Sequence, residues 1–126
     1  MLALVTGASS GIGLEYAKAL AEQGYDLLIV SNQEKEIKET AISLHRNWNV
    51  DVTPLYVDLT EENAVKDLVN YCHEHNLEVD MLVNNAGVFF FNELVKTDPR
   101  RIDIMLDLHV KTVTRMCRYF GEEMKN

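Results

Sequence analysis

Short apolar runs alternate along the chain with longer segments in which apolar residues recur every three or four positions. The short runs are typical of buried β-strands, whereas the longer spacing places apolar side chains on one face of a helix. This alternation predicts repeated βα units and an α/β fold, and it disfavours an all-helical or all-β domain. The predicted strands are residues 2–5, 26–31, 50–57 and 79–84.

Four helices are predicted between and after these strands, at residues 12–21, 34–47 and 61–75 and in a longer segment that begins at Pro99. Gly24 suits the position that follows a helix, Asp98 can cap the last helix, and Thr60 is a candidate cap for the third. The first helix is expected to face the core with Ile12, Ala17, Leu20 and Ala21. The apolar faces of the last helix are supplied by Ile102, Met105, Leu106, Val113, Met116, Cys117 and Phe120.

Pro54 interrupts the third predicted strand. Because proline cannot donate a ladder hydrogen bond, a strand that contains it belongs at the edge of a sheet. In a doubly wound parallel sheet the strand order begins 3-2-1-4, which places the third strand at an edge. We therefore predict a Rossmann-type doubly wound parallel sheet of about four strands in the order 3-2-1-4, with about four helices.

A glycine-rich segment, TGASSGIG at residues 6–13, lies between the first strand and the first helix. Its glycines at positions 7, 11 and 13 let the backbone turn tightly and approach a ligand, because a Cβ would block the turn or the ligand. The helix that follows offers unpaired N–H groups and the positive end of its dipole. The segment is therefore predicted to bind a pyrophosphate group.

Composition excludes several classes of protein. The 126 residues carry a formal net charge of −8 at pH 7, which disfavours a nucleic-acid partner because phosphate binding needs clustered Lys and Arg. No stretch approaches the ~20 apolar residues that span a bilayer, so no membrane association is predicted. Met1 leads directly into the first strand without a secretory signal, and a cytoplasmic location is expected. Cys72 and Cys117 are too few for a disulfide framework.

Three motifs occur in order along the chain: the glycine-rich segment, Asp58 within the sequence VDLT, and the sequence NNAG at residues 84–87. Together they resemble the short-chain dehydrogenase/reductase (SDR) family, and the resemblance covers essentially the whole chain. It implies binding of a nicotinamide dinucleotide, with the glycines around the pyrophosphate, Asp58 on the adenine ring and residues 85–87 along the adenosine ribose and the path to the nicotinamide. Asn84 is expected to stabilise the sheet. A plain alternative is that Asp58 starts a turn before Thr60.

The end of the second predicted strand bears on the choice between NAD and NADP. An Asp or Glu there would bond the 2′-hydroxyl of NAD and repel a 2′-phosphate. Ser31, Asn32 and Gln33 occupy this position, with neither an acid nor an arginine among them. Their neutral donors could still bond a phosphate, with help from Lys35, so NADP is favoured and NAD stays possible. The predicted cofactor-binding residues are Gly7, Ser9, Ser10, Gly11, Ile12, Gly13, Ser31, Asn32, Gln33, Asp58, Leu59, Asn85, Ala86 and Gly87.

The resemblance implies hydride transfer between the nicotinamide and an alcohol or ketone carbon, which in this family uses a Ser and a Tyr-x-x-x-Lys motif. None of the five tyrosines here has a lysine four residues later. We therefore expect residues 1–126 to be an NAD(P)-binding half-domain, with the catalytic Ser, Tyr and Lys on a strand and helix that would follow Asn126. The asparagine that supports the family's proton relay corresponds to His109. An imidazole could carry the proton with a pH dependence near neutrality, or could be purely structural.

Three functions stay open at this point. The chain is part of an NAD(P)-dependent oxidoreductase for a small-molecule alcohol or carbonyl substrate, a dinucleotide-binding module without turnover, or a scaffolding protein that keeps only the fold. The fourth strand would have an open edge and the last helix displays apolar residues, so a homo-oligomer through either is predicted. His73 and His75 do not share a helical face, and no metal site is expected.

Overall fold

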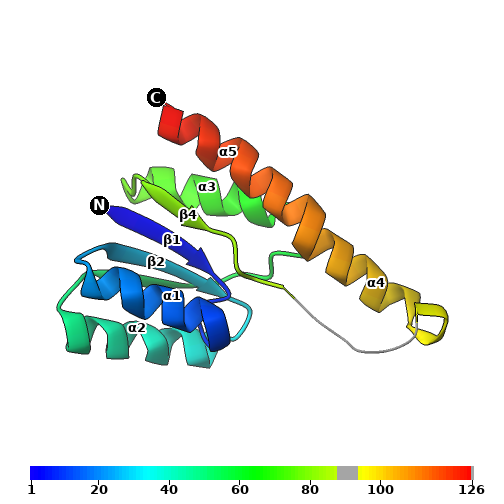
Figure 1. The fold of residues 1–126 in the computed structure, drawn as a ribbon. Helices are drawn as coiled ribbons and strands as arrows, with labels where there is room; N and C mark the ends of the chain where they lie inside the picture. Colours follow the sequence, from blue (N-terminus) through cyan, green and yellow to red (C-terminus); the bar gives the residue numbers. More distant parts are fainter. Residues whose placement is uncertain (88–93, 126) are drawn as a thin grey trace.

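The computed structural model describes residues 1–87 and 94–125, and its sheet has four parallel strands in the order β3-β2-β1-β4 (Figure 1). The strands are β1 (Leu2–Thr6), β2 (Asp26–Ser31), β3 (Val52–Tyr56) and β4 (Met81–Val83). The central position of β1 aligns its Val5 with Ile29 of β2 and Val83 of β4. The predicted strand order and parallel direction are confirmed, although β3 and β4 are shorter than predicted.

Helices cover both faces of this sheet (Figure 1). One layer consists of α1 (Gly11–Glu22) and α2 (Glu34–Trp48), and the opposite layer consists of α3 (Ala64–Glu74) and α5 (Val113–Lys125). Alternating residues of a strand point to opposite faces, so the sheet contributes to two cores. The predicted doubly wound arrangement is confirmed.

Strand β1 shows how the sequence fills both layers. Ala3 and Val5 belong to the core under α1 and α2, whereas Leu4 belongs to the core under α3 and α5. Met116 and Phe120 of α5 are buried in that second core. Because both faces of the strand are covered, its sequence is a continuous apolar run instead of an alternating one.

Pro54 lies in β3 opposite Ile29 of β2, and β3 is an outer strand of the sheet. An outer strand has one side without a partner strand, where a missing N–H breaks no ladder bond. The edge position inferred from this proline is confirmed.

The last predicted helix is not one continuous α-helix. Among the described residues it comprises α4 (Pro99–Leu106), a π-helical segment η2 (Asp107–Thr112) and α5, and the 3₁₀ turn η1 (Leu94–Lys96) precedes it. Asp98 caps α4 as predicted, since its Oδ1 accepts a hydrogen bond of 2.9 Å from the N–H of Arg100.

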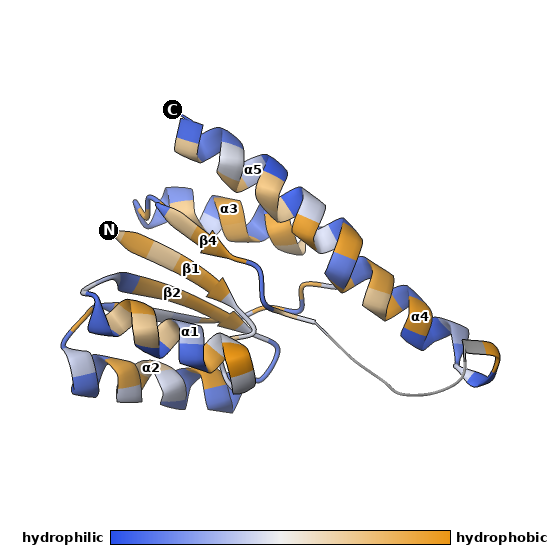
Figure 2. Ribbon diagram, in the orientation of Figure 1, coloured by the Kyte–Doolittle hydropathy of each residue, from blue (hydrophilic) through white to orange (hydrophobic). Residues whose placement is uncertain are grey.

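Most apolar residues of this long helix do not reach the core, as the prediction that the helix displays apolar residues implies. The helix is longer than the sheet, and α4 projects beyond it (Figures 1 and 2). No residue of α4 is buried, and Leu106 and Cys117 are exposed. Of the residues predicted to form its apolar faces, Met116 and Phe120 are the buried ones.

Two further local predictions were wrong. Ile12 is 70% exposed and lies off the core-facing side of α1. Thr60 does not cap α3, which begins at Ala64, because the Thr60 N–H and hydroxyl both donate to Oδ1 of Asp58, at 2.9 and 2.6 Å.

Gly24 follows α1 with φ +89°, as its predicted position after a helix requires. Within residues 1–87 and 94–125, no helix combines the length and apolar character needed to cross a membrane.

Candidate functional site

A cleft of about 460 Å³ lies where the carboxyl ends of β1, β2 and β4 meet the start of α1. Parallel strands all point toward this edge, so the residues that follow each strand are brought together there. The described lining residues are Gly7, Ser9, Ser10, Val30, Ser31, Asn32, Gln33, Val57, Asp58, Leu59, Thr60, Asn85, Ala86, Gly87, Ile104 and Leu108.

The glycine-rich segment forms the turn that leads into α1. The N–H of Gly7 donates to the carbonyl of Val30 at 2.8 Å, which ties the turn to β2. Gly7 has φ +66°, and a Cβ on it would lie 2.9 Å from Cα of Ala86. Both its conformation and its close approach to Ala86 therefore require glycine. Ser10 is extended, and α1 begins at Gly11 with its N-terminus toward the cleft.

Gly13 lies behind this turn and not on the cleft. It is buried, and an added Cβ would overlap the carbonyl oxygen of Gly7 and lie 2.8 Å from the carbonyl carbon. The Nδ2 of Asn85 donates to the same carbonyl at 3.3 Å. Gly13 thus allows α1 to pack closely against the turn, which is the role of the last glycine in dinucleotide-binding turns.

A ring of hydrogen bonds among Ser9, Ser31 and Gln33 forms the wall of the cleft at the end of β2. The N–H of Gln33 donates to Oγ of Ser31 at 3.0 Å, and Oγ of Ser9 donates to Oε1 of Gln33 at 2.7 Å. The Oγ atoms of Ser9 and Ser31 are 2.9 Å apart. Because the Ser9 hydroxyl has one proton and gives it to Gln33, Ser31 must be the donor to Ser9. This ring uses Oε1 of Gln33 and leaves its Nε2 outside the ring.

The turn at residues 57–60, which follows β3, forms another part of the rim of the cleft. It is anchored to β2, since the N–H of Val57 donates to the carbonyl of Ser31 at 3.0 Å. Asp58 is the one charged residue in the described lining of the cleft, and its Oδ1 holds Thr60 as given above. The turn predicted as the plain alternative for Asp58 is therefore present, and Asp58 nevertheless faces the cleft.

Thr6, at the end of β1, positions the third motif. Its side chain is buried, and its Oγ1 accepts hydrogen bonds of 3.0 Å from the N–H groups of both Asn85 and Ala86. The chain leaving β4 is thereby held against β1 where it borders the cleft. Asn84 lies outside the lining and donates from Nδ2 to Sγ of Cys117 at 3.5 Å, which links β4 to α5.

His109 does not line the cleft but lies against one of its walls. A Cβ added to Gly87 would be 2.9 Å from Nε2 of His109, so the imidazole packs directly on the backbone of Gly87. His109 belongs to η2, and its neighbour Leu108 lines the cleft. Helical segments of π type are often found at functional sites.

The structure thus brings most of the predicted cofactor-binding residues to one cleft. The exceptions are Gly11, Ile12 and Gly13, which form the first turn of α1 beside it. Sequence reasoning missed the lining residues Val30, Val57, Thr60, Ile104 and Leu108. Val30 and Val57 could have been found, because each lies at or just before the carboxyl end of a predicted strand. The last two come from a helix whose position against the cleft carries no local sequence signal.

Outside the cleft, the histidines of α3 and its C-cap have partners of their own. The Nε2 of His73 pairs with Oε1 of Glu123 at 3.1 Å, and the ring of His75 stacks on Tyr71 with centroids 4.0 Å apart. Among the residues that the structure describes, no group of three or more His, Cys, Asp and Glu side chains could hold a metal ion. Cys72 is buried nearby, and burial together with the charge of Glu123 raises the pKa of its thiol to about 11.

The chain belongs to the short-chain dehydrogenase family, because the model of the family described as short chain dehydrogenase matches residues 1–126. An uncharacterized oxidoreductase of Staphylococcus saprophyticus is 34% identical over 110 residues, which cover 87% of this chain and 47% of that protein. L-sorbose reductase from Gluconobacter frateurii, solved with NADPH and L-sorbose, has a TM-score of 0.91 and 30% identity and covers 98% of this chain and 47% of its own. An alcohol dehydrogenase from Thermococcus sibiricus, solved with 5-hydroxy-NADP, has a TM-score of 0.91 and 28% identity, over 98% of this chain and 53% of its own. The chain therefore spans about half the length of these relatives.

Proposed function

We propose that the cleft binds NADP, with NAD as a possible alternative, in an oxidoreductase of the short-chain dehydrogenase type. The observation that carries the proposal is the convergence of the α1 N-terminus with the carboxyl ends of β1, β2 and β4 on one cleft. Ligands of open α/β sheets bind at such a point, with a pyrophosphate on the helix N-terminus. The sorbose reductase and the alcohol dehydrogenase were solved with NADPH and 5-hydroxy-NADP, which supports the choice of cofactor.

The described residues fit such a ligand from one end to the other. The backbone of residues 9–12 would hold the pyrophosphate, because the first turn of α1 offers N–H groups without acidic side chains. The ring of Ser9, Ser31 and Gln33 would face the 2′ position of the adenosine ribose, with Asn32 beside it. Asp58 and Leu59 would border the adenine, and residues 85–87 would lead toward the nicotinamide.

The bound nicotinamide would supply or accept the hydride exchanged with a small-molecule alcohol or carbonyl substrate. Within this chain, His109 would carry a proton near the end of β4, where its ring packs on Gly87. A His109→Leu variant is then expected to lower turnover of the intact protein, whereas His109→Asn, which keeps a hydrogen-bonding side chain, retains turnover. Steady-state rates with NADPH and a panel of carbonyl compounds check this role. Equal rates in both variants would assign His109 to packing alone.

Calorimetric titration of the intact protein with NADPH and NADH tests the cofactor site directly. Ser31→Asp places a carboxylate where the 2′-phosphate is proposed to lie, so the affinity for NADPH should fall about tenfold or more while that for NADH is kept or improved. Asn47→Asp adds the same charge at an exposed position near the other end of α2 and should change neither affinity. If the unmodified protein binds neither dinucleotide, or if Ser31→Asp weakens both ligands equally, the proposed site is wrong.

The proposal includes a homo-oligomer and a cytoplasmic location, with no nucleic-acid partner. Exposed Ile104 and Leu106 of α4 and the outer edge of β4 support self-association through the last helix or the edge strand. Sedimentation of the intact protein and of Leu106→Glu separates the two: loss of the oligomer indicates the helix, and its retention indicates the strand. A monomer at all concentrations contradicts both.

Free thiols at Cys72 and Cys117 suit a reducing compartment, and cell fractionation tests the proposed cytoplasmic location.

A further inference from the structure

The π-helical segment η2 packs on Gly87 through His109. It also makes a second contact with a segment that lines the cleft. The hydroxyl of Thr112 donates to the backbone carbonyl of Leu59 at 2.7 Å, and this hydrogen bond is buried. Thr112 is 6% exposed and is not among the residues that line the cleft. Its contact with the cleft therefore passes through Leu59.

The position of the Leu59 carbonyl affects the shape of the cleft, because Leu59 belongs to its rim. The side chain of Leu59 is buried in the core between the sheet, α3 and α5, while the residue also lines the cleft. Asp58 and Thr60 on either side are joined to each other through Oδ1 of Asp58, so the three residues form one compact turn. A hydrogen bond to the central carbonyl fixes the orientation of the whole turn.

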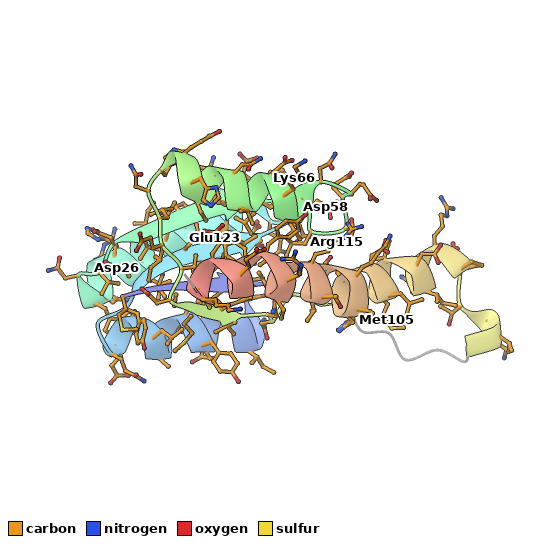
Figure 3. All side chains as sticks on the ribbon, turned by 90° about the horizontal axis from the view of Figure 1, so that it is seen from above. Asp26, Asp58, Lys66, Met105, Arg115 and Glu123 are labelled. Atoms are coloured by element: carbon orange, nitrogen blue, oxygen red, sulfur yellow. The ribbon has the colours of Figure 1, made fainter. Side chains whose placement is uncertain are left out.

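A second contact joins the same two parts of the chain one helical turn further along. The Nη1 of Arg115 donates to the carbonyl of Glu62 at 3.1 Å, and its Nη2 lies 3.3 Å from Oε1 of the same residue. Figure 3 shows Arg115 on the side of the long helix that faces the segment bearing Asp58. Glu62 is exposed, so this ion pair is weak, and the buried bond of Thr112 is the stronger of the two.

We infer that Thr112 is a positioning residue for the adenosine end of the dinucleotide, acting through the carbonyl of Leu59 on the turn at residues 58–60. This inference rests on the proposed function. It also implies that adenosine binding orders η2, because the turn and the helix share this buried hydrogen bond. The segment that holds His109 against Gly87 is then coupled to the opposite end of the cleft.

Two ligands separate this role from a general loss of structure. NADPH contains the adenosine end, whereas reduced nicotinamide mononucleotide lacks it. Thr112→Val keeps the shape of the side chain and removes the hydroxyl, so we expect the affinity for NADPH to fall about tenfold while that for the mononucleotide changes less than about twofold. Thr112→Ser keeps the hydroxyl and should bind NADPH like the unmodified protein.

Several outcomes overturn the inference. Unchanged NADPH affinity in Thr112→Val shows that the hydrogen bond does not matter for binding. Equal weakening of both ligands assigns Thr112 to general stability, and an equal loss in Thr112→Ser assigns the effect to packing. If the unmodified protein binds neither NADPH nor the mononucleotide, it is the proposed function that fails.

Hydrogen exchange on the unmodified protein provides a test that does not depend on the folding of a variant. The probe is adenosine 2′,5′-bisphosphate, which represents the adenosine end alone. We expect it to slow amide exchange both at residues 58–62 and in η2, because the two are joined by the Thr112 bond. Protection of residues 58–62 without protection of η2 contradicts the coupling.

Discussion

Gly13→Ala adds one carbon atom where the structure has no room for it. The new Cβ would overlap the carbonyl oxygen of Gly7 and lie 2.8 Å from its carbonyl carbon. Both atoms are backbone in the turn that β2 holds through the N–H of Gly7, so relief requires α1 or the turn to shift. Over-packing of this kind costs about 1–3 kcal/mol, and a clash with backbone belongs at the upper end. We expect a loss of about 3 kcal/mol, or roughly a hundredfold in the unfolding equilibrium.

Urea and thermal unfolding of the intact protein, followed by circular dichroism, measure this loss. A change of about 3 kcal/mol lowers the Tm by roughly 10 °C for a domain of this size. Gly121→Ala is the matched control, because a Cβ on Gly121 meets no atom within 4 Å and the residue lies inside α5. Alanine is the better helix former, so the control should gain up to about 1 kcal/mol.

The reasoning is refuted if Gly13→Ala unfolds at the same urea concentration as the unmodified protein, or if Gly121→Ala is destabilised as much. A double variant adds a further check. The Nδ2 of Asn85 also lies within reach of the new Cβ, but the nearest atom is the backbone oxygen of Gly7. Removing the side chain with Asn85→Ala should therefore not restore the stability of Gly13→Ala.

Three other predictions concern Thr6 and the two cysteines. Thr6→Val removes the oxygen that accepts hydrogen bonds of 3.0 Å from two partly buried N–H groups, so it should cost about 2 kcal/mol in the free energy of unfolding, measured with urea. Burial raises the pKa of the Cys72 thiol from 9.0 to about 11, so the folded protein holds this proton more tightly than the unfolded chain does. The stability that it contributes is complete below about pH 9 and is lost as the pH rises from 9 to 11, and Cys72→Ala should flatten this part of the curve. A thiol reagent at pH 8 should modify exposed Cys117 quickly and buried Cys72, which is 3% exposed, slowly.

The sheet could be predicted because each piece of evidence for it is local. Apolar runs mark the strands, and Pro54 excludes its strand from the centre, which is enough to favour the observed order. The cleft followed from the same logic, since residues at the carboxyl ends of parallel strands must meet at one edge. The places of Ser31, Asp58 and Asn85 near the ends of predicted strands were therefore enough to predict that they lie together.

The long helix could not be predicted to the same extent because its structure depends on contacts distant in sequence. Its apolar periodicity indicates a helix correctly, but the periodicity does not show where the sheet ends beneath it. Leu106 is exposed because α4 projects beyond the sheet, whereas Cys117 is exposed on α5 although Met116 and Phe120 beside it are buried. The π-helical segment and the bond from Thr112 to Leu59 join residues on different elements, and neither has a local signal.

The glycine-rich segment shows how one motif combines two physical requirements. Sequence reasoning assigned its three glycines jointly to the tight turn and to the ligand. In the structure, Gly13 is required by the packing of α1 on the turn, whereas a Cβ on Gly11 would meet no protein atom within 4 Å and its φ of +57° is what favours glycine there. A loss of dinucleotide binding in a Gly13 variant therefore reports a displaced helix, and it does not by itself identify a contact with the ligand. The neutral ring at Ser9, Ser31 and Gln33 is the better place to test recognition, because changes there alter charge at the cleft without disturbing the core.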